Sequence, residues 1–156
     1  MKTLILFATK YGATAVIAQK IADKIQGAAL HNLKTKGLPS VADYDCVIIG
    51  SSVYAGRIRK EARVFLSKNK NLLVEKKLGF FVSGIGASGG DKFLKDNFPA
   101  DLLQNARAAA FLGGIFDPQK AGSFERFIIK IITKSSACIN IIDDKKIEEF
   151  ADAMMR

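Results

Sequence analysis

The stretch TLILFATKYGATAVIAQKIADKI, residues 3–25, contains a strand, a turn and a helix in immediate succession. Residues 3–8 form a short apolar run, which favours a buried strand. From residue 13 onward the apolar side chains follow a helical period, and Val16, Ile17 and Ile21 share one face. A strand that passes through a short turn into an amphipathic helix begins a βαβ unit, so the stretch predicts an α/β fold.

The same alternation continues along the chain. Four more apolar runs have the length and composition of strands: 28–33, which is the weakest, 45–50, 78–84 and 108–114. Segments of helical period follow at 59–73, 91–98 and 144–155, the last with Asp143 or Asp144 as its N-cap. Because the strands are apolar almost throughout, helices should cover both faces of the sheet. Right-handed crossovers then give an open parallel sheet of five strands.

Composition predicts one globular domain, residues 1–156, because 49% of the residues are hydrophobic and the length suits a single core. The N-terminal apolar run is too short for a signal peptide. A membrane-spanning helix needs about 18 consecutive apolar residues, and no apolar stretch of the sequence is that long. We therefore expect a cytoplasmic protein.

The sequence gives little support for a metal site or for a catalytic nucleophile. Cys46 and Cys138 lie far apart without partners at metal-ligand spacing, so we predict neither a metal site nor a disulfide. Cys46 falls in an apolar strand and is expected to be a small buried hydrophobe. The single histidine, His31, has no serine or cysteine partner in a nucleophile motif and is expected to be structural. No side chain is predicted to be catalytic.

The turn TKYGAT, residues 9–14, has the features of a phosphate site. Backbone N–H groups at a helix N-terminus converge with partial positive charge, and Gly12 permits a tight turn. The hydroxyls of Thr9 and Thr14 can add donors without adding charge. A second interpretation stays open, in which the two threonines only cap the helix. Neither GxxxxGK[ST] nor GxGxxG is present after the first strand, so the pattern favours a mononucleotide.

The order and spacing of Thr9, Gly12 and Thr14 in LFATKYGATAVIA resemble the phosphate loop of flavodoxins. Two further loops, IIGSSVYAGRIR at 48–59 and FVSGIGASGGDKF at 81–93, are similar to the loops that flank the flavin in that family. The resemblance implies a flavodoxin-like three-layer α-β-α sandwich with strand order 2-1-3-4-5, and it implies FMN as the cofactor.

The resemblance also implies which residues contact FMN. They belong to the three loops: Thr9, Lys10, Tyr11, Gly12, Ala13, Thr14, Ser51, Ser52, Val53, Tyr54, Ala55, Gly56, Ser83, Gly84, Ile85 and Gly86. Tyr54 would stack on the flavin, although a tyrosine exposed only to solvent is the alternative. The Ala55–Gly56 peptide would turn a carbonyl toward the flavin on reduction, and backbone donors of 83–86 would approach its pyrimidine edge.

Two departures from electron-carrier flavodoxins concern the partner. The loop SGIGASGGD contains no aromatic residue, so one face of the flavin is expected to be open to a substrate. The chain carries a net charge of +9, and residues 57–77 hold eight basic and two acidic residues, or +6. The partner should therefore be acidic or anionic, unless this segment is simply a solvated basic helix. Nucleic acid is not expected, because no binding motif or interleaved aromatics accompany the charge.

A third departure is an insertion after the fifth strand. GGIFDPQKAGSFERFIIKIITKSS, residues 113–136, predicts a basic amphipathic helix over 122–136. Its apolar side chains share one stripe: Phe124, Phe127, Ile128, Ile131 and Ile132. Arg126, Lys130 and Lys134 lie opposite. This helix is expected either to contact the inner face of a membrane or a large apolar substrate, or to be buried in the core.

The insertion resembles the menaquinone-dependent protoporphyrinogen dehydrogenase branch of the flavodoxin superfamily. That resemblance implies an FMN-dependent oxidoreductase of haem biosynthesis, which takes hydride equivalents from a porphyrinogen and passes them to a quinone. An electron carrier or quinone reductase on the same fold is the second hypothesis, and a flavin-free protein-binding module is the third.

Overall fold

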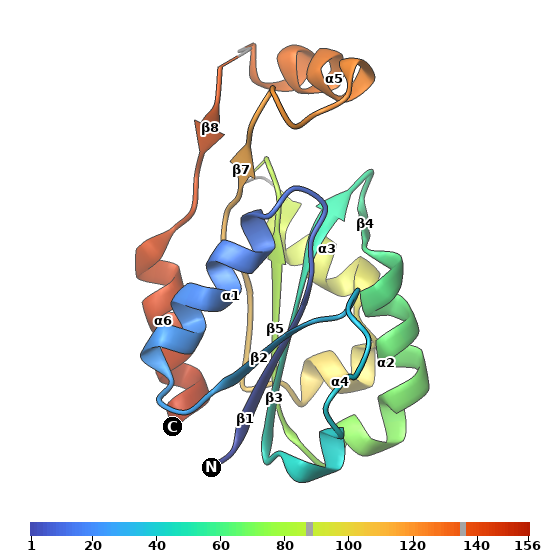
Figure 1. The fold of residues 1–156 in the computed structure, drawn as a ribbon, viewed down its shortest axis with the longest axis vertical. Helices are drawn as coiled ribbons and strands as arrows, with labels where there is room; N and C mark the ends of the chain where they lie inside the picture. Colours follow the sequence, from blue (N-terminus) through green and yellow to red (C-terminus); the bar gives the residue numbers. More distant parts are fainter. Residues whose placement is uncertain (87–88, 135–136) are drawn as a thin grey trace.

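Five parallel strands form the central sheet of the computed structural model (Figure 1). They are β1 (Thr3–Ala8), β2 (Ala29–Asn32), β3 (Cys46–Tyr54), β5 (Lys77–Ser83) and β6 (Ala108–Phe111). Their order across the sheet is β2-β1-β3-β5-β6, which is the predicted order 2-1-3-4-5 of the parallel strands. A short strand absent from the prediction, β4 (Arg57–Ile58), pairs antiparallel with the end of β3.

The structure describes residues 1–86, 89–134 and 137–156, and within these it leaves out the side chains of 124, 125, 128, 131 and 132. Part of the predicted loop at 81–93 and the end of the predicted helix at 122–136 therefore lie outside the described residues. None of the helices in the described ranges has both the length and the hydropathy to cross a membrane.

Helices cover both faces of the sheet, as the apolar strands predicted (Figure 1). On one face lie α1 (Ala13–Lys24) and α6 (Asp144–Met155), and on the other α2 (Lys60–Leu73), α3 (Gly90–Asn97), α4 (Ala100–Gln104) and a 3-10 turn, Val41–Asp43. Along β1, Leu4 and Leu6 pack toward α2, whereas Ile5 and Phe7 pack toward α1 and α6. One apolar run thus supplies two cores.

Local predictions about single residues agree with this packing. Asp143 caps α6, because its Oδ1 accepts a hydrogen bond of 3.0 Å from the backbone N–H of Lys146. Cys46 is fully buried, and this burial raises the pKa of its thiol above the ordinary value. His31 lies in β2, with Nε2 3.0 Å from the hydroxyl of Thr35.

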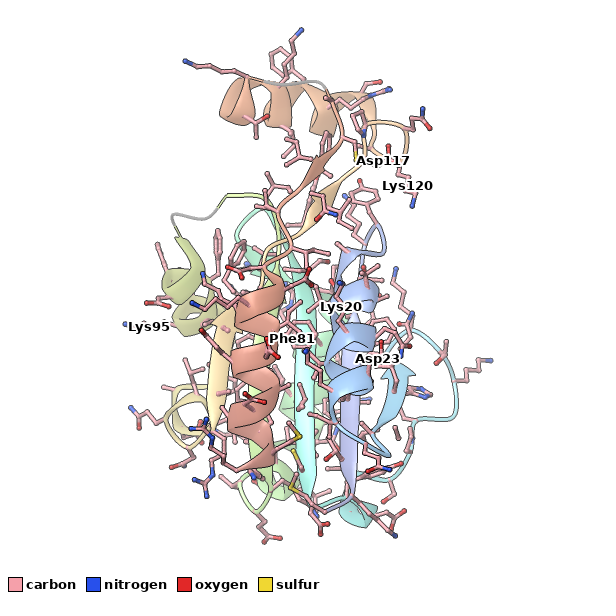
Figure 2. The ribbon with its side chains drawn as sticks, turned by 90° about the vertical axis from the view of Figure 1, so that its left-hand side faces the viewer. Lys20, Asp23, Phe81, Lys95, Asp117 and Lys120 are labelled. Carbon is pink, nitrogen blue, oxygen red and sulfur yellow. The ribbon has the colours of Figure 1, made fainter. Side chains whose placement is uncertain are left out.

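The insertion forms an arm beyond the carboxyl ends of the strands. The arm, residues 115–140, leaves through β7 (Ile115–Phe116), carries α5 (Ser123–Thr133) and returns through β8 (Ile139–Asn140), which pairs antiparallel with β7. Figure 2 shows α5 above the body of the molecule, with Asp117 and Lys120 in the turn that leads to it. The predicted helix is confirmed over 123–133.

The arm joins the body at a tight backbone crossing formed by Gly84, Gly113, Gly114 and Ile141. The N–H of Gly84 donates to the carbonyl of Gly113 over 3.0 Å, and the N–H of Ile141 donates to the carbonyl of Gly114 over 2.9 Å. A Cβ on Gly113 would lie 1.9 Å from the carbonyl oxygen of Ile141, and one on Gly114 would lie 2.6 Å from that of Gly84. The paired glycines are therefore required by the closeness of three backbone segments.

Candidate functional site

A cavity of about 380 Å³ lies at the carboxyl ends of the parallel strands and brings the three predicted loops together. The predicted residues that line it come from all three: Thr9, Lys10, Tyr11, Ala13, Ser52, Val53, Tyr54, Ala55, Gly56, Ser83, Gly84 and Ile85. The other predicted residues, Gly12, Thr14, Ser51 and Gly86, belong to the same loops but do not line it. The position fits the rule that ligands of open α/β sheets bind where the strand order reverses, here between β1 and β3.

The first loop presents the N-terminus of α1 to the cavity. Gly12 is the N-cap, with a left-handed φ of +104°, and no side chain caps the helix. The hydroxyl of Thr9 accepts a 2.9 Å hydrogen bond from the N–H of Gly12 and so stabilises the turn. Thr14 is fully buried, with its hydroxyl 2.7 Å from that of Ser83. This contact joins the first loop to the third.

The second loop is a two-residue hairpin turn between β3 and β4. Ala55 and Gly56 both have positive φ, +50° and +76°, which is the pattern of a type I′ turn. Alanine is an unfavourable residue in this conformation, by about 1 kcal/mol or more. Asn97 of α3 holds the turn, because its Nδ2 donates to the carbonyl of Gly56 over 3.0 Å and its Oδ1 accepts from the N–H of Ile58 over 2.9 Å.

The two serines that precede this turn have different surroundings. Ser51 is buried, and its hydroxyl accepts a 2.9 Å hydrogen bond from the N–H of Arg59 and donates to the carbonyl of Ser52. The hydroxyl oxygen of Ser52 is buried and has no hydrogen-bond partner among the described residues. Because Ser52 also lines the cavity, a polar group of a ligand could form the hydrogen bond that its hydroxyl lacks.

One backbone donor of the third loop is already used within the protein. The N–H of Gly84 donates to Gly113 at the crossing, so this group cannot also serve a ligand. Gly86 adopts a left-handed φ of +115° and lies outside the cavity lining, whereas Ile85 lines it. Residues 87–88 of this predicted loop lie outside the described residues.

The far wall of the cavity comes from residues that were not predicted to contact the cofactor: Phe93, Gly114, Ile115, Phe116 and Ile129. Phe93 belongs to α3, and the others belong to the crossing and the arm. The aromatic side chains missing from the third loop are therefore supplied by α3 and β7. Among the described side chains of α5, Ile129 reaches the cavity, whereas Phe127 of the predicted stripe is 62% exposed.

Charge in the cavity is concentrated on one side chain. Among the described lining residues, only Lys10 is charged. Its ammonium lies 3.4 Å from the ring centroid of Tyr54 and 5.0 Å from that of Tyr11, in cation–π contact with both. The described residues contain no group of three His, Cys, Asp or Glu side chains that could hold a metal ion.

An apolar cavity at the reversal point of an open parallel sheet defines a doubly wound α/β protein with a site for one small organic ligand. The chain belongs to the flavodoxin family, since the family model described as Flavodoxin domain matches residues 4–138.

Relatives and solved structures agree with this family. Protoporphyrinogen IX dehydrogenase [quinone] of Escherichia coli K12 is 28% identical over 147 residues, which cover 87% of this chain and 81% of the relative. A flavodoxin of Streptococcus pneumonia TIGR4 superposes with a TM-score of 0.62 at 16% identity, covering 99% of this chain and 98% of that one. A Lactobacillus acidophilus NCFM flavoprotein solved in complex with FMN has a TM-score of 0.51 at 19% identity, over 72% of this chain and 90% of that one.

Proposed function

We propose that the chain is an FMN-binding redox protein, with the cofactor in the cavity formed by the three loops. Three observations support the fit. The N-terminus of α1 has no side-chain cap and is preceded by the left-handed Gly12, which suits a phosphate. The buried hydroxyl of Ser52 is without a partner among the described residues. The ring of Tyr54, 41% exposed, lies beside a largely apolar lining that suits a flat ring system.

Bound FMN supplies the transfer of hydride or single electrons, and the chain binds and orients it. The first loop would hold the phosphate through the N–H groups at the start of α1. The hairpin turn at Ala55–Gly56 would face the reactive edge, and Ile85 would lie at the pyrimidine side. Phe116 and Ile129 would limit access of water from the arm side of the cavity.

We further propose a dehydrogenase of the protoporphyrinogen type, which passes reducing equivalents to a quinone in haem biosynthesis. The support is the similarity to a relative of that name over 87% of this chain, together with the arm that forms one wall of the cavity. The net charge of +9 suits a substrate with carboxylates. The protein would act in the cytoplasm, at the inner face of a membrane, with α5 as the contact.

The test of this proposal uses the purified chain of residues 1–156. Bound FMN would make the protein yellow, with visible absorbance that is lost on removal of the cofactor. Anaerobic incubation with protoporphyrinogen should then bleach the flavin, and menaquinone should restore its colour. A yellow protein that porphyrinogen does not reduce would contradict the dehydrogenase assignment while leaving the cofactor assignment intact.

The second candidate is an electron carrier or quinone reductase. It is favoured by the superposition on a bacterial flavodoxin over 99% of this chain. Reduction of the bound flavin by an acidic redox protein, or by a nicotinamide donor with quinone as acceptor, would support it if porphyrinogen is inert. A colourless protein that does not take up FMN would favour a flavin-free interaction module.

Substitution of Gly56 by valine should shift the potential at which the bound flavin takes up its first electron. Valine at a φ of +76° is unfavourable by about 1 kcal/mol or more, so the turn would change its peptide orientation beside the cofactor. That free energy corresponds to roughly 40 mV for one electron. A redox titration monitored by visible absorbance would measure it. Gly37→Val, also at positive φ but outside the cavity lining, is the control, and equal titrations of all three proteins would exclude this turn as the flavin contact.

Substitution of Phe127 by serine should weaken binding to membranes without unfolding the protein. Phe127 is 62% exposed on α5 next to the exposed Arg126, so its ring is available to a lipid surface. Loss of one inserted aromatic side chain should reduce partitioning onto anionic vesicles by about tenfold, as measured by co-sedimentation. Val64→Ser, on the exposed face of α2, is the control. A sharp fall in melting temperature of the Phe127 variant would instead indicate a packing role.

A further inference from the structure

The side chain of Lys10 occupies a place that a flavin would need. Its ammonium lies 3.4 Å from the ring centroid of Tyr54, which puts the cation directly on the ring face. Both residues line the cavity, so this contact lies inside the site. A ring face covered by an ammonium cannot at the same time stack on an isoalloxazine. Cofactor binding and the Lys10–Tyr54 contact therefore compete on that face.

Lys10 also belongs to the loop that leads to the N-terminus of α1, directly after Thr9. Of the described lining residues it alone carries a charge, so it is the cation with which an anionic ligand group in the cavity would pair. The remaining donors of this loop are neutral. A cation added to such a site distinguishes a charged phosphate from a neutral hydroxyl much more strongly than neutral donors do.

We infer that Lys10 is a specificity residue that covers Tyr54 in the free protein and pairs with the cofactor phosphate when FMN binds. The inference rests on the proposed function and deepens it. Movement of the ammonium from the ring to the phosphate uncovers Tyr54 for the flavin. Riboflavin has no phosphate with which the ammonium can pair. Its binding therefore breaks the contact of Lys10 with Tyr54 and gives Lys10 no ion pair in return. Lys10 therefore adds to the preference for FMN over riboflavin that the N–H groups at the start of α1 provide.

The experiment measures the dissociation constants of FMN and riboflavin by quenching of flavin fluorescence. In Lys10→Met, which keeps the length of the side chain and removes the charge, the preference for FMN should fall by about tenfold or more. FMN should bind more weakly, whereas riboflavin should bind equally well or better. The weakening of FMN binding by added salt should also be smaller than in the unsubstituted protein.

Two further variants make the result specific. Lys10→Arg should retain the preference for FMN, and Lys68→Met should behave as the unsubstituted protein, because Lys68 is exposed on α2 and has the same charge. If circular dichroism shows that Lys10→Met does not fold, Lys10→Gln replaces it. An unchanged ratio of the two dissociation constants in a folded Lys10 variant would overturn the inference. Failure of the unsubstituted protein to bind either flavin would instead contradict the proposed function, and the inference with it.

Discussion

Gly12→Val should leave a folded protein that binds FMN much more weakly. The φ of +104° at Gly12 is unfavourable for a β-branched residue by about 2 kcal/mol, which corresponds to about thirtyfold in affinity if binding requires that conformation. A Cβ at Gly12 would meet no atom within 4 Å, so the loss would come from the backbone and not from a clash. A backbone that relaxes to negative φ would redirect the N–H groups at the start of α1. Equilibrium dialysis against FMN measures the effect.

Gly37→Val is the matched control for this experiment. Gly37 has a φ of +78° and also has no atom within 4 Å of the added Cβ, but it lies outside the cavity lining. Both variants should therefore lose similar stability, and only the Gly12 variant should bind FMN more weakly. Undiminished FMN affinity in Gly12→Val would remove the first loop from the proposed phosphate site.

Gly113→Ala should destabilise the whole domain by about 3 kcal/mol or more. The added methyl group would lie 1.9 Å from the carbonyl oxygen of Ile141, and the residue has a φ of +82°. Neither backbone can move easily, because Gly113 and Ile141 are both tied into the hydrogen bonds of the crossing. For a domain of this size the melting temperature should fall by about 6 °C or more. Thermal unfolding followed by circular dichroism provides the measurement.

Two controls separate the causes of that destabilisation. Gly27 has a φ of +76° with no atom within 4 Å of an added Cβ, so Gly27→Ala reports backbone strain alone. Gly122 has neither a positive φ nor an atom within 4 Å of an added Cβ. The melting temperature of Gly122→Ala should therefore change by no more than about 2 °C. If the Gly113 variant has the same melting temperature as the Gly27 variant, the backbones of Gly113 and Ile141 can move apart without loss of stability.

The sheet and its two layers of helices were predictable because their signals are local. The run from Leu4 to Phe7 is apolar at every position, and the structure shows the reason, since alternate side chains enter the two cores. The helical period after residue 13 and the N-cap at Asp143 likewise depend only on neighbours in sequence. Strand order came from the resemblance of three loops, because periodicity alone does not specify it.

Other features depend on contacts between distant segments and gave no local signal. The hairpin turn has Ala55 at a φ of +50°, whereas asparagine or glycine would have indicated such a turn. The hydrogen bonds of Asn97 to that turn span about forty residues of sequence. Strands β7 and β8 have two residues each, too few for any periodicity. The walls supplied by Phe93 and Ile129, and the contact of Lys10 with Tyr54, likewise follow only from the folded chain.

The pairing of β7 with β8 means that the chain leaves and re-enters the body at almost the same point, since Ile115 lies opposite Asn140. Because the two ends of the insertion lie side by side, a short turn can replace it, and no strand of the sheet has to change position. Shortening such a loop also lowers the entropy lost on closing it. The arm can therefore be deleted or transferred as one unit, and its transfer would give another member of the family a new wall over its ligand site.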